Sequence, residues 1–385
     1  MKTSARRILL GPGPSNVDPR VREALSAPLL GHLDPEFLAI ADETQDLLRR
    51  TFRTSNPITF PVSGTGSAGM ESCFVNLVEP GDPVLVCVNG VFGTRMVDVA
   101  ERCGAAVTKV EAPWGRAVDP EDVARAVKKS EPKIIALVHA ETSTGALTPV
   151  PPIAGIARDC GALLLVDTVT SLAGIPVEVD GWGIDACYSG TQKCLSCPPG
   201  LAPASYSPRA LRRVLARKTK VASWYLDLTL LTRYWGKERV YHHTAPVSMI
   251  FALRAALQIV LEEGLAARWA RHDLNHRALA AGLEAMNLAL VVPAAERLPQ
   301  LNAVAIPAGV DDLAVRQRLL DEFKIEIGAG LGVFSGKVWR VGLMGYSASR
   351  DNVIALLEAL EVILPRAGHR FSPGAAVRAA EEIYP

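Results

Sequence analysis

Short apolar runs and longer stretches of mixed polarity alternate along the first half of the chain. Apolar runs of about four to eight residues, bounded by turn residues, are typical of strands buried on both faces. In the stretches between them apolar residues recur at helical spacing, which is typical of helices that cover a sheet. Strands separated by single helices imply right-handed crossovers, so the pattern predicts a mostly parallel sheet flanked by helices.

The expected elements follow from this pattern. Strands are expected near 60–63 and at 83–89, 105–111, 133–139, 162–167 and 185–188. Helices are expected from residue 18, at 35–51, after the turn that follows residue 63 and up to about 78, and at 93–103, 120–129 and 153–160. An aromatic-rich stretch, 223–247, interrupts the alternation, and two helices are expected over 248–286. Strands at 303–306 and 338–342 and helices at 313–323 and 350–364 then predict a smaller α+β unit.

The chain has 385 residues, which is too long for one simple core and predicts two domains. We expect an extended arm over 1–20, a large domain over 21–262 and a small C-terminal domain over 263–385. The fold class is therefore α/β.

Composition narrows the class of protein. With 49% hydrophobic and 21% charged residues the chain is an ordinary globular protein, and its net charge of +1 gives no reason to invoke nucleic acid or an anionic membrane. No apolar run approaches a membrane span, and the segment after the basic N-terminus is too short for a signal peptide, so we expect a cytoplasmic protein. The seven cysteines form no disulfide framework, and Cys194-x-x-Cys197 lacks a second pair for zinc.

Two residues at strand ends carry the candidate chemistry. Asp167 ends the apolar strand at 162–167, and Lys193 follows the next strand in the small polar turn Ser-Gly-Thr-Gln-Lys. The carboxyl ends of parallel strands are where open α/β sheets place their ligands. An amine that can form a Schiff base and an acid that can hold a proton on a ring nitrogen are what pyridoxal 5′-phosphate (PLP) requires.

Other polar segments are expected at the same edge. The turn at 63–69 (Ser-Gly-Thr-Gly-Ser-Ala-Gly) leads from a strand into a helix, so its backbone N–H groups and the helix dipole suit a phosphate. It matches neither the dinucleotide fingerprint nor the P-loop. The loop at 140–145 leaves the strand before Asp167, and the three segments together predict a phosphate-containing ligand.

Arg340 and the pair His242 and His243 are further candidates for binding residues. Arg340 lies inside an apolar strand, where it is either an outward-facing edge residue or a bidentate partner for a substrate carboxylate. His242 and His243 could suggest a metal, but side chains at adjacent positions are expected to point apart. We therefore predict no metal site.

Several motifs in order resemble one family. They are Leu-Leu-Gly-Pro-Gly-Pro at 9–14, Ser-Gly-Thr-Gln-Lys at 189–193 with Pro-Pro-Gly at 198–200, Tyr-His-His-Thr at 241–244, and the stretch from Gly330 to Gly342. Across nearly its whole length the chain resembles the class V, fold-type I PLP aminotransferases of the alanine–glyoxylate and serine–pyruvate group. The resemblance implies a homodimer with shared active sites and a transaminase that works by a ping-pong cycle.

The resemblance also implies the site residues. The cofactor would be held by Thr65, Gly66, Ser67, Phe92, Thr142, Asp167, Val169, Gln192 and Lys193, with Tyr241 and Thr244 from the partner subunit. Lys193 would form the Schiff base and act as the general base, and Asp167 would hold the pyridinium proton. Arg340 would bind the substrate α-carboxylate, with Gly13 as a second substrate-binding residue. Phe92 stands where relatives often carry Trp, and Ser67 stands where some relatives carry His.

The resemblance leaves the substrates open. We expect an amino donor such as alanine or serine and glyoxylate or pyruvate as acceptor, with (S)-ureidoglycine as the alternative donor. A cysteine desulfurase of the same fold is disfavoured because the loop 328–336 contains no cysteine. A non-catalytic scaffold is disfavoured because Lys193 and Asp167 are both present.

Overall fold

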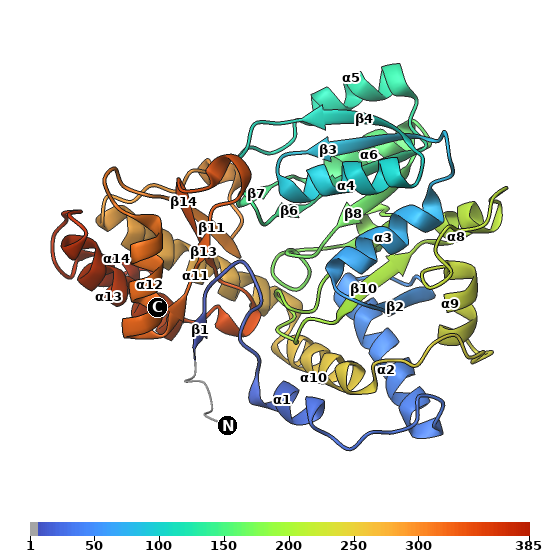
Figure 1. Ribbon diagram of the computed structural model, residues 1–385, viewed down its shortest axis with the longest axis horizontal. Helices are drawn as coiled ribbons and strands as arrows, with labels where there is room; N and C mark the ends of the chain where they lie inside the picture. Colours follow the sequence, from blue (N-terminus) through green and yellow to red (C-terminus); the bar gives the residue numbers. More distant parts are fainter. Residues whose placement is uncertain (1–6) are drawn as a thin grey trace.

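A seven-stranded sheet forms the centre of the larger part of the molecule (Figure 1). The computed structural model describes residues 7–385. The strands, in spatial order, are β2 (Ile58–Ser63), β10 (Leu201–Tyr206), β9 (Ala186–Tyr188), β8 (Leu163–Asp167), β5 (Ile134–Val138), β3 (Pro83–Val88) and β4 (Ala106–Glu111). Strand β10 is antiparallel to both of its neighbours and all other pairs are parallel, which confirms the mostly parallel sheet.

Helices flank this sheet, as the alternation predicts. They are α1 (Pro19–Leu25), α2 (Pro35–Phe52), α3 (Gly66–Leu77), α4 (Val91–Arg102), α5 (Pro120–Ser130), α6 (Val150–Asp159), α7 (Val179–Trp182), α8 (Pro208–Leu215), α9 (Leu228–Trp235) and α10 (Val247–Glu263). Three begin with an Asp-Pro pair: Asp18, Asp34 and Asp119 each accept a hydrogen bond from a backbone N–H of the first turn. Proline fits the first helical position because that N–H needs no partner.

A smaller group of elements lies beside the large sheet, at the left of Figure 1. It contains α11 (Leu265–Ala285), β11 (Leu301–Ala305), α12 (Asp312–Phe323), β12 (Ile325–Glu326), β13 (Gly328–Ala329), β14 (Val338–Gly342), α13 (Arg350–Arg366) and α14 (Ala375–Glu381). Strand β14 is the middle strand of an antiparallel sheet ordered β11-β14-β13. The N-terminal strand β1 (Ile8–Leu9) pairs in parallel with β12.

The two groups have separate hydrophobic cores. The larger core runs from Val21 to Val260, and the smaller core contains side chains from α11 to α14. Leu10 is fully buried in the smaller core, so the N-terminal segment packs with the C-terminal elements. We propose that the domain boundary lies at the α10–α11 junction, near the expected division at 262/263. The expected arm at 1–20 includes residues 1–6, which lie outside the described residues.

Strand β10 is the main element that the sequence pattern did not predict. Pro203 lies in its middle, and a proline argues against an interior strand because it lacks the N–H that a ladder needs.

Among residues 7–385 no helix is long and apolar enough to cross a membrane. The same residues contain no cluster of three or more His, Cys, Asp or Glu side chains that could hold a metal ion.

Candidate active site

The predicted polar segments meet at one edge of the large sheet. Strands β2, β8 and β9 point the same way, since β10 is antiparallel to both β2 and β9 and β9 is parallel to β8. The turn after β2, the loop after β5, Asp167 at the end of β8 and the turn after β9 therefore share the carboxyl edge. The expected convergence is confirmed.

The turn after β2 offers uncapped backbone donors. Thr65 is the residue before α3, and its side chain makes no capping hydrogen bond. A Cβ on Gly66 would lie 3.1 Å from Val169 Cγ2 and 3.6 Å from the carbonyl oxygen of Ser189, so this turn packs tightly against the segments after β8 and β9. Ser67, one residue later, accepts a 3.3 Å hydrogen bond from Nη1 of Arg95 on α4. An anion at this helix N-terminus would meet free N–H groups and the positive end of the dipole.

Asp167 is buried, with 2% of its surface exposed. Its Oδ1 accepts a 2.7 Å hydrogen bond from the backbone N–H of Val169, and its Oδ2 accepts one of 2.7 Å from the hydroxyl of Tyr188 on β9. Burial raises the pKa of Asp167 to about 7, against these two hydrogen bonds, which favour the ionised form. A carboxyl group held this way exchanges a proton near neutral pH.

Lys193 is nearly buried, and its Nζ donates a hydrogen bond to the carbonyl oxygen of Pro12. Burial, and then the charge of Arg340, lower the pKa of Lys193 to about 8. Gly13 has φ of +101°, and a Cβ there would lie 2.7 Å from Lys193 Cδ. Glycine at this position therefore gives the lysine its space, and the substrate-binding role expected for Gly13 stays a prediction.

The loop after β5 caps the N-terminus of helix α4. Glu141 is fully buried; its Oε2 accepts hydrogen bonds from the backbone N–H groups of Phe92 (3.1 Å) and Gly93 (3.3 Å). Its Oε1 accepts from the backbone N–H (3.0 Å) and the hydroxyl (2.6 Å) of Ser143. Burial raises the pKa of Glu141 despite these donors. The carboxylate thereby fixes the first turn of α4, which carries Phe92, and the loop that carries Thr142.

Arg340 reaches across from the smaller group of elements to this loop. Its Nε donates to the carbonyl oxygen of Ala329 (2.7 Å) and its Nη1 to that of Thr142 (3.1 Å). Burial lowers its pKa to about 10. The outward-facing edge residue considered for Arg340 is wrong, because β14 is a central strand and the side chain is 7% exposed. Its Nη2 makes no hydrogen bond with residues 7–385 and is free to bind an anion.

Tyr241 and Thr244 make no side-chain hydrogen bond with the other expected site residues among residues 7–385. Both are exposed, and Tyr241 packs against His32 at a ring separation of 5.4 Å. The histidines between them are hydrogen-bonded to each other, Nδ1 to Nδ1 at 2.9 Å, so the expectation that adjacent rings point apart is wrong. His243 Nε2 also lies 2.9 Å from Ser63 Oγ at the end of β2, which ties this segment to the turn that carries Thr65.

The donor set fits PLP. The side-chain amide of Gln192 makes no hydrogen bond with the described residues, so its NH2 group can donate to a phosphate oxygen. A nearby helix N-terminus with free N–H groups suits a phosphate, and a buried acid and a buried amine suit a ring nitrogen and an aldehyde. Cys194 and Cys197 are buried free thiols, as expected for small apolar side chains.

Sequence reasoning missed three residues at this edge. Tyr188 holds Asp167, Glu141 holds α4, and the Arg95 guanidinium lies 5.0 Å from the ring centroid of Phe92. Only Glu141 gave a signal, since it is a carboxylate in a loop already expected at the site. The roles of Tyr188 and Arg95 depend on contacts between separate elements, which periodicity does not report.

Comparison with known proteins gives consistent matches. The family model of class V aminotransferases matches residues 23–353. The (S)-ureidoglycine–glyoxylate transaminase of Bacillus subtilis is 42% identical over 98% of this chain and 95% of its own length. A crystal structure of that organism's ureidoglycine–glyoxylate aminotransferase superposes with a TM-score of 0.98, at 43% identity and 99% coverage of both chains. An alanine–glyoxylate aminotransferase structure from Nostoc sp. is 51% identical, covers 94% of this chain and 97% of its own, and has a TM-score of 0.93.

Proposed function

Because the chain belongs to the class V aminotransferase family and has its fold-type I architecture, it is an aminotransferase, and we propose that it uses PLP to move an amino group from a small amino acid to glyoxylate or pyruvate. The observation that carries this proposal is the convergence of three buried charged groups, Lys193, Asp167 and Arg340, at one sheet edge. Each is costly to bury alone, and together they suit the aldehyde and the ring nitrogen of the cofactor and the carboxylate of a substrate.

The residues would divide the work by chemistry. PLP, when bound, supplies the electron sink for the carbanion at the substrate Cα. Lys193, with a pKa of about 8, loses its proton near neutral pH and can move a proton at that Cα. Asp167 holds a proton on the pyridine nitrogen, and Arg340 binds the substrate α-carboxylate and thereby orients the Cα–H bond.

The remaining predicted residues would bind the cofactor. We assign its phosphate to Thr65, Gly66, Ser67 and Gln192, and its ring to Phe92, Thr142 and Val169. Tyr241 and Thr244 would complete the phosphate site of a second copy, because both are exposed in the single chain. The proposal therefore includes a homodimer. The cytoplasmic location stays a prediction.

Alanine or serine is the proposed donor, and glyoxylate or pyruvate the acceptor. (S)-Ureidoglycine is retained as an alternative donor, because a transaminase named for that substrate is 42% identical over nearly the full chain. Both kinds of donor have an α-carboxylate that Arg340 would bind and an α-amine that would react with the cofactor, so Arg340 and Lys193 do not distinguish between them.

A single-turnover titration tests the proposal. The purified protein is loaded with PLP, and alanine, serine and a ureidoglycine source are each added without acceptor. We expect the visible band of the lysine-bound cofactor to fall while the band of the aminated cofactor grows, fastest with the physiological donor. Glyoxylate and pyruvate are then added separately to the aminated enzyme, and the faster recovery of the visible band identifies the acceptor.

Two results would contradict the proposal. A PLP-loaded protein whose visible band responds to none of these donors acts on another substrate class. A protein that forms no visible band with PLP does not use this cofactor through Lys193.

A further inference from the structure

A buried arginine lies behind the turn that carries Lys193. Arg268, in the first turn of α11, is 3% exposed. Its Nη2 donates a 2.6 Å hydrogen bond to the carbonyl oxygen of Cys194, the residue after Lys193. Its Nη1 donates one of 2.6 Å to Glu263 Oε2 at the end of α10. A buried ion pair of this kind contributes little to stability. Its position against the turn that carries Lys193 therefore suggests a role other than stability.

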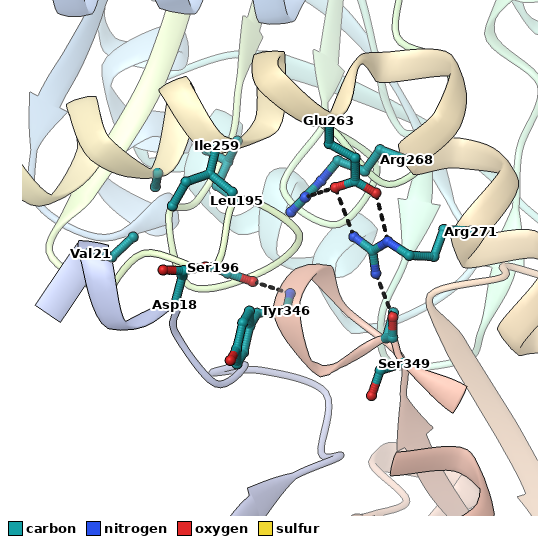
Figure 2. Close-up of a pocket in the computed structure, with 12 residues that line it drawn as sticks. Asp18, Val21, Leu195, Ser196, Ile259, Glu263, Arg268, Arg271, Tyr346 and Ser349 are labelled. Carbon is teal, nitrogen blue, oxygen red and sulfur yellow. Dashed lines mark hydrogen bonds and ion pairs between the residues drawn. The ribbon is translucent and has the colours of Figure 1, made fainter. Parts of the chain in front are cut away.

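Glu263 joins this arginine to a second one (Figure 2). Glu263 Oε1 accepts a 2.6 Å hydrogen bond from Nε of Arg271, one helical turn beyond Arg268. Arg271 Nη1 in turn donates to the carbonyl oxygens of Gly345 (3.0 Å) and Ala348. These carbonyls belong to the turn that follows β14, the strand that carries Arg340. One carboxylate therefore connects the backbone beside Lys193 with the backbone beyond Arg340.

A hydrogen bond also joins the turn that carries Lys193 to the turn after β14, and another joins the Lys193 turn to the N-terminal segment. Ser196 Oγ accepts a 2.7 Å hydrogen bond from the backbone N–H of Tyr346, a contact that Figure 2 also shows. Ser15 Oγ donates to the carbonyl oxygen of Lys193 at 3.0 Å. The carbonyls of Lys193 and Cys194 are thus both held, one by Ser15 and the other by Arg268. These two bonds restrict the rotation of the two peptide units that follow Lys193, and so restrict the backbone from which its side chain extends.

We propose that Arg268 is a positioning residue for Lys193, and that Glu263 and Arg271 maintain the spacing between Lys193 and Arg340. The inference rests on the proposed roles of Lys193 and Arg340. A proton is moved at the substrate Cα only if the amine and the carboxylate-binding group are correctly spaced, because reacting groups must be held within about 0.5 Å of the productive geometry. Lys193 and Arg340 lie on segments whose neighbouring residues pack into different hydrophobic cores, so a connection across the α10–α11 junction would keep their spacing.

The space around Arg268 allows it to be substituted without steric conflict. A cavity of about 240 Å³, lined in part by Val21, Leu195 and Ile259, lies against Arg268 and Arg271. An Arg268→Met side chain therefore has room to settle, and Glu263 keeps Arg271 as a partner. Arg268→Lys keeps the charge and can make one of the two bonds. The matched control is Arg277→Met on the same helix, where Arg277 makes an exposed 2.9 Å ion pair with Asp273.

The experiment compares four holoenzymes: wild type, Arg268→Met, Arg268→Lys and Arg277→Met. For each, we measure the single-turnover rate with alanine, the KM for alanine, the pH midpoint of the visible cofactor band and the thermal unfolding midpoint. Arg268→Met is expected to slow the single turnover about 10- to 100-fold and to shift the pH midpoint, with KM changed less than about threefold. Arg268→Lys should recover part of the rate, and Arg277→Met should match wild type in every measurement. If Arg268→Met does not fold, the Arg268→Lys variant carries the comparison.

Two outcomes distinguish this inference from the proposed function. If Arg268→Met melts earlier but keeps the wild-type rate and pH midpoint, Arg268 only stabilises the junction and the inference is wrong. If wild type forms no visible band with PLP, the proposed function fails instead. The pH dependence of Lys193 modification by an amine reagent, followed by peptide mass in the cofactor-free proteins, then decides the inference: equal profiles in wild type and Arg268→Met would overturn it.

Discussion

At the scale of single residues, burial shifts the candidate catalytic groups towards their neutral forms. It raises the pKa of Asp167 to about 7 and, with the charge of Arg340, lowers that of Lys193 to about 8. An acid and an amine with pKa values this close to neutrality can each gain or lose a proton under physiological conditions. Reactivity at this edge is therefore a property of the burial that the fold imposes.

Substitution of Lys193 removes the amine that the proposed chemistry needs. We expect Lys193→Ala to bind PLP without forming the visible band and to lose about 10²- to 10⁴-fold or more in transamination rate. Reduction with borohydride followed by peptide mass measures covalent attachment directly. Lys220→Ala, at an exposed position, serves as the control. Retention of the band in Lys193→Ala would contradict the assignment.

Substitution of Tyr188 tests how Asp167 is held. The Tyr188 hydroxyl favours the ionised carboxylate, so Tyr188→Phe should raise the pKa of Asp167 further above its ordinary value. A hydrogen bond to a charged group contributes about 1.5–3 kcal/mol, so the pKa of Asp167 should rise by roughly one to two. Because the ionised form binds a protonated ring nitrogen, PLP affinity on the acid side should fall, and its midpoint should move to higher pH.

The measurement for Tyr188 is the PLP dissociation constant of the cofactor-free protein as a function of pH. Tyr206→Phe is the matched control, since Tyr206 is also fully buried in the large sheet but bonds Ser72 Oγ at 2.9 Å. Equal pH profiles for the two variants would show that Tyr188 does not act on Asp167.

At the scale of elements, α4 depends on a carboxylate that comes from a different segment. Glu141→Gln would place an amide donor against backbone N–H groups of Phe92 and Gly93 or of Ser143. We expect a loss of about 1–3 kcal/mol in the free energy of unfolding and weaker PLP binding, because Phe92 is in the disturbed turn. Denaturant unfolding and PLP titration measure the two effects.

The control for Glu141 is the cap of α5. Asp119→Ala removes a 2.8 Å hydrogen bond at an exposed helix start and should cost about 1 kcal/mol. It should leave PLP affinity unchanged, since no predicted site residue lies on α5. If both variants weaken PLP equally, the effect of Glu141 is only a loss of stability.

Elements were predictable from sequence where the signal was local. Asp-Pro pairs give the starts of α1, α2 and α5, and apolar runs give the parallel strands. Asp167 and Lys193 could be predicted because their positions at strand ends follow from chain order alone. Strand β10 could not, because Pro203 argues against an interior strand. The contact of Tyr188 with Asp167 depends on the register of β8 against β9, which no local pattern specifies.

At the scale of the whole molecule, the proposed homodimer makes a prediction about Tyr241 and Thr244, which are both exposed in the single chain. If each subunit lends these residues to its partner, two defective variants should complement each other. Lys193→Ala is co-expressed with a Tyr241→Ala, Thr244→Val double variant. One of the two shared sites in each hybrid dimer is then intact, so the purified hybrid should have about half of the wild-type activity.

The readout is transamination by the purified hybrid, isolated with a different affinity tag on each variant. The tagged hybrid should be a dimer by mass, and each variant alone should be nearly inactive. A hybrid dimer without recovered activity would show that Tyr241 and Thr244 serve the site of their own chain or no site.

The pairing of β1 with β12 has a consequence for the order in which the protein can be made. Ile8 pairs with Ile325, Leu10 is buried in the C-terminal core, and Pro12 contacts Lys193 midway along the chain. During synthesis the large sheet can form as its strands leave the ribosome, but residues 8–14 have no complete partner until β12 and β14 emerge. Lys193 therefore gains its full surroundings only after β14, about 150 residues later in the chain, has been made.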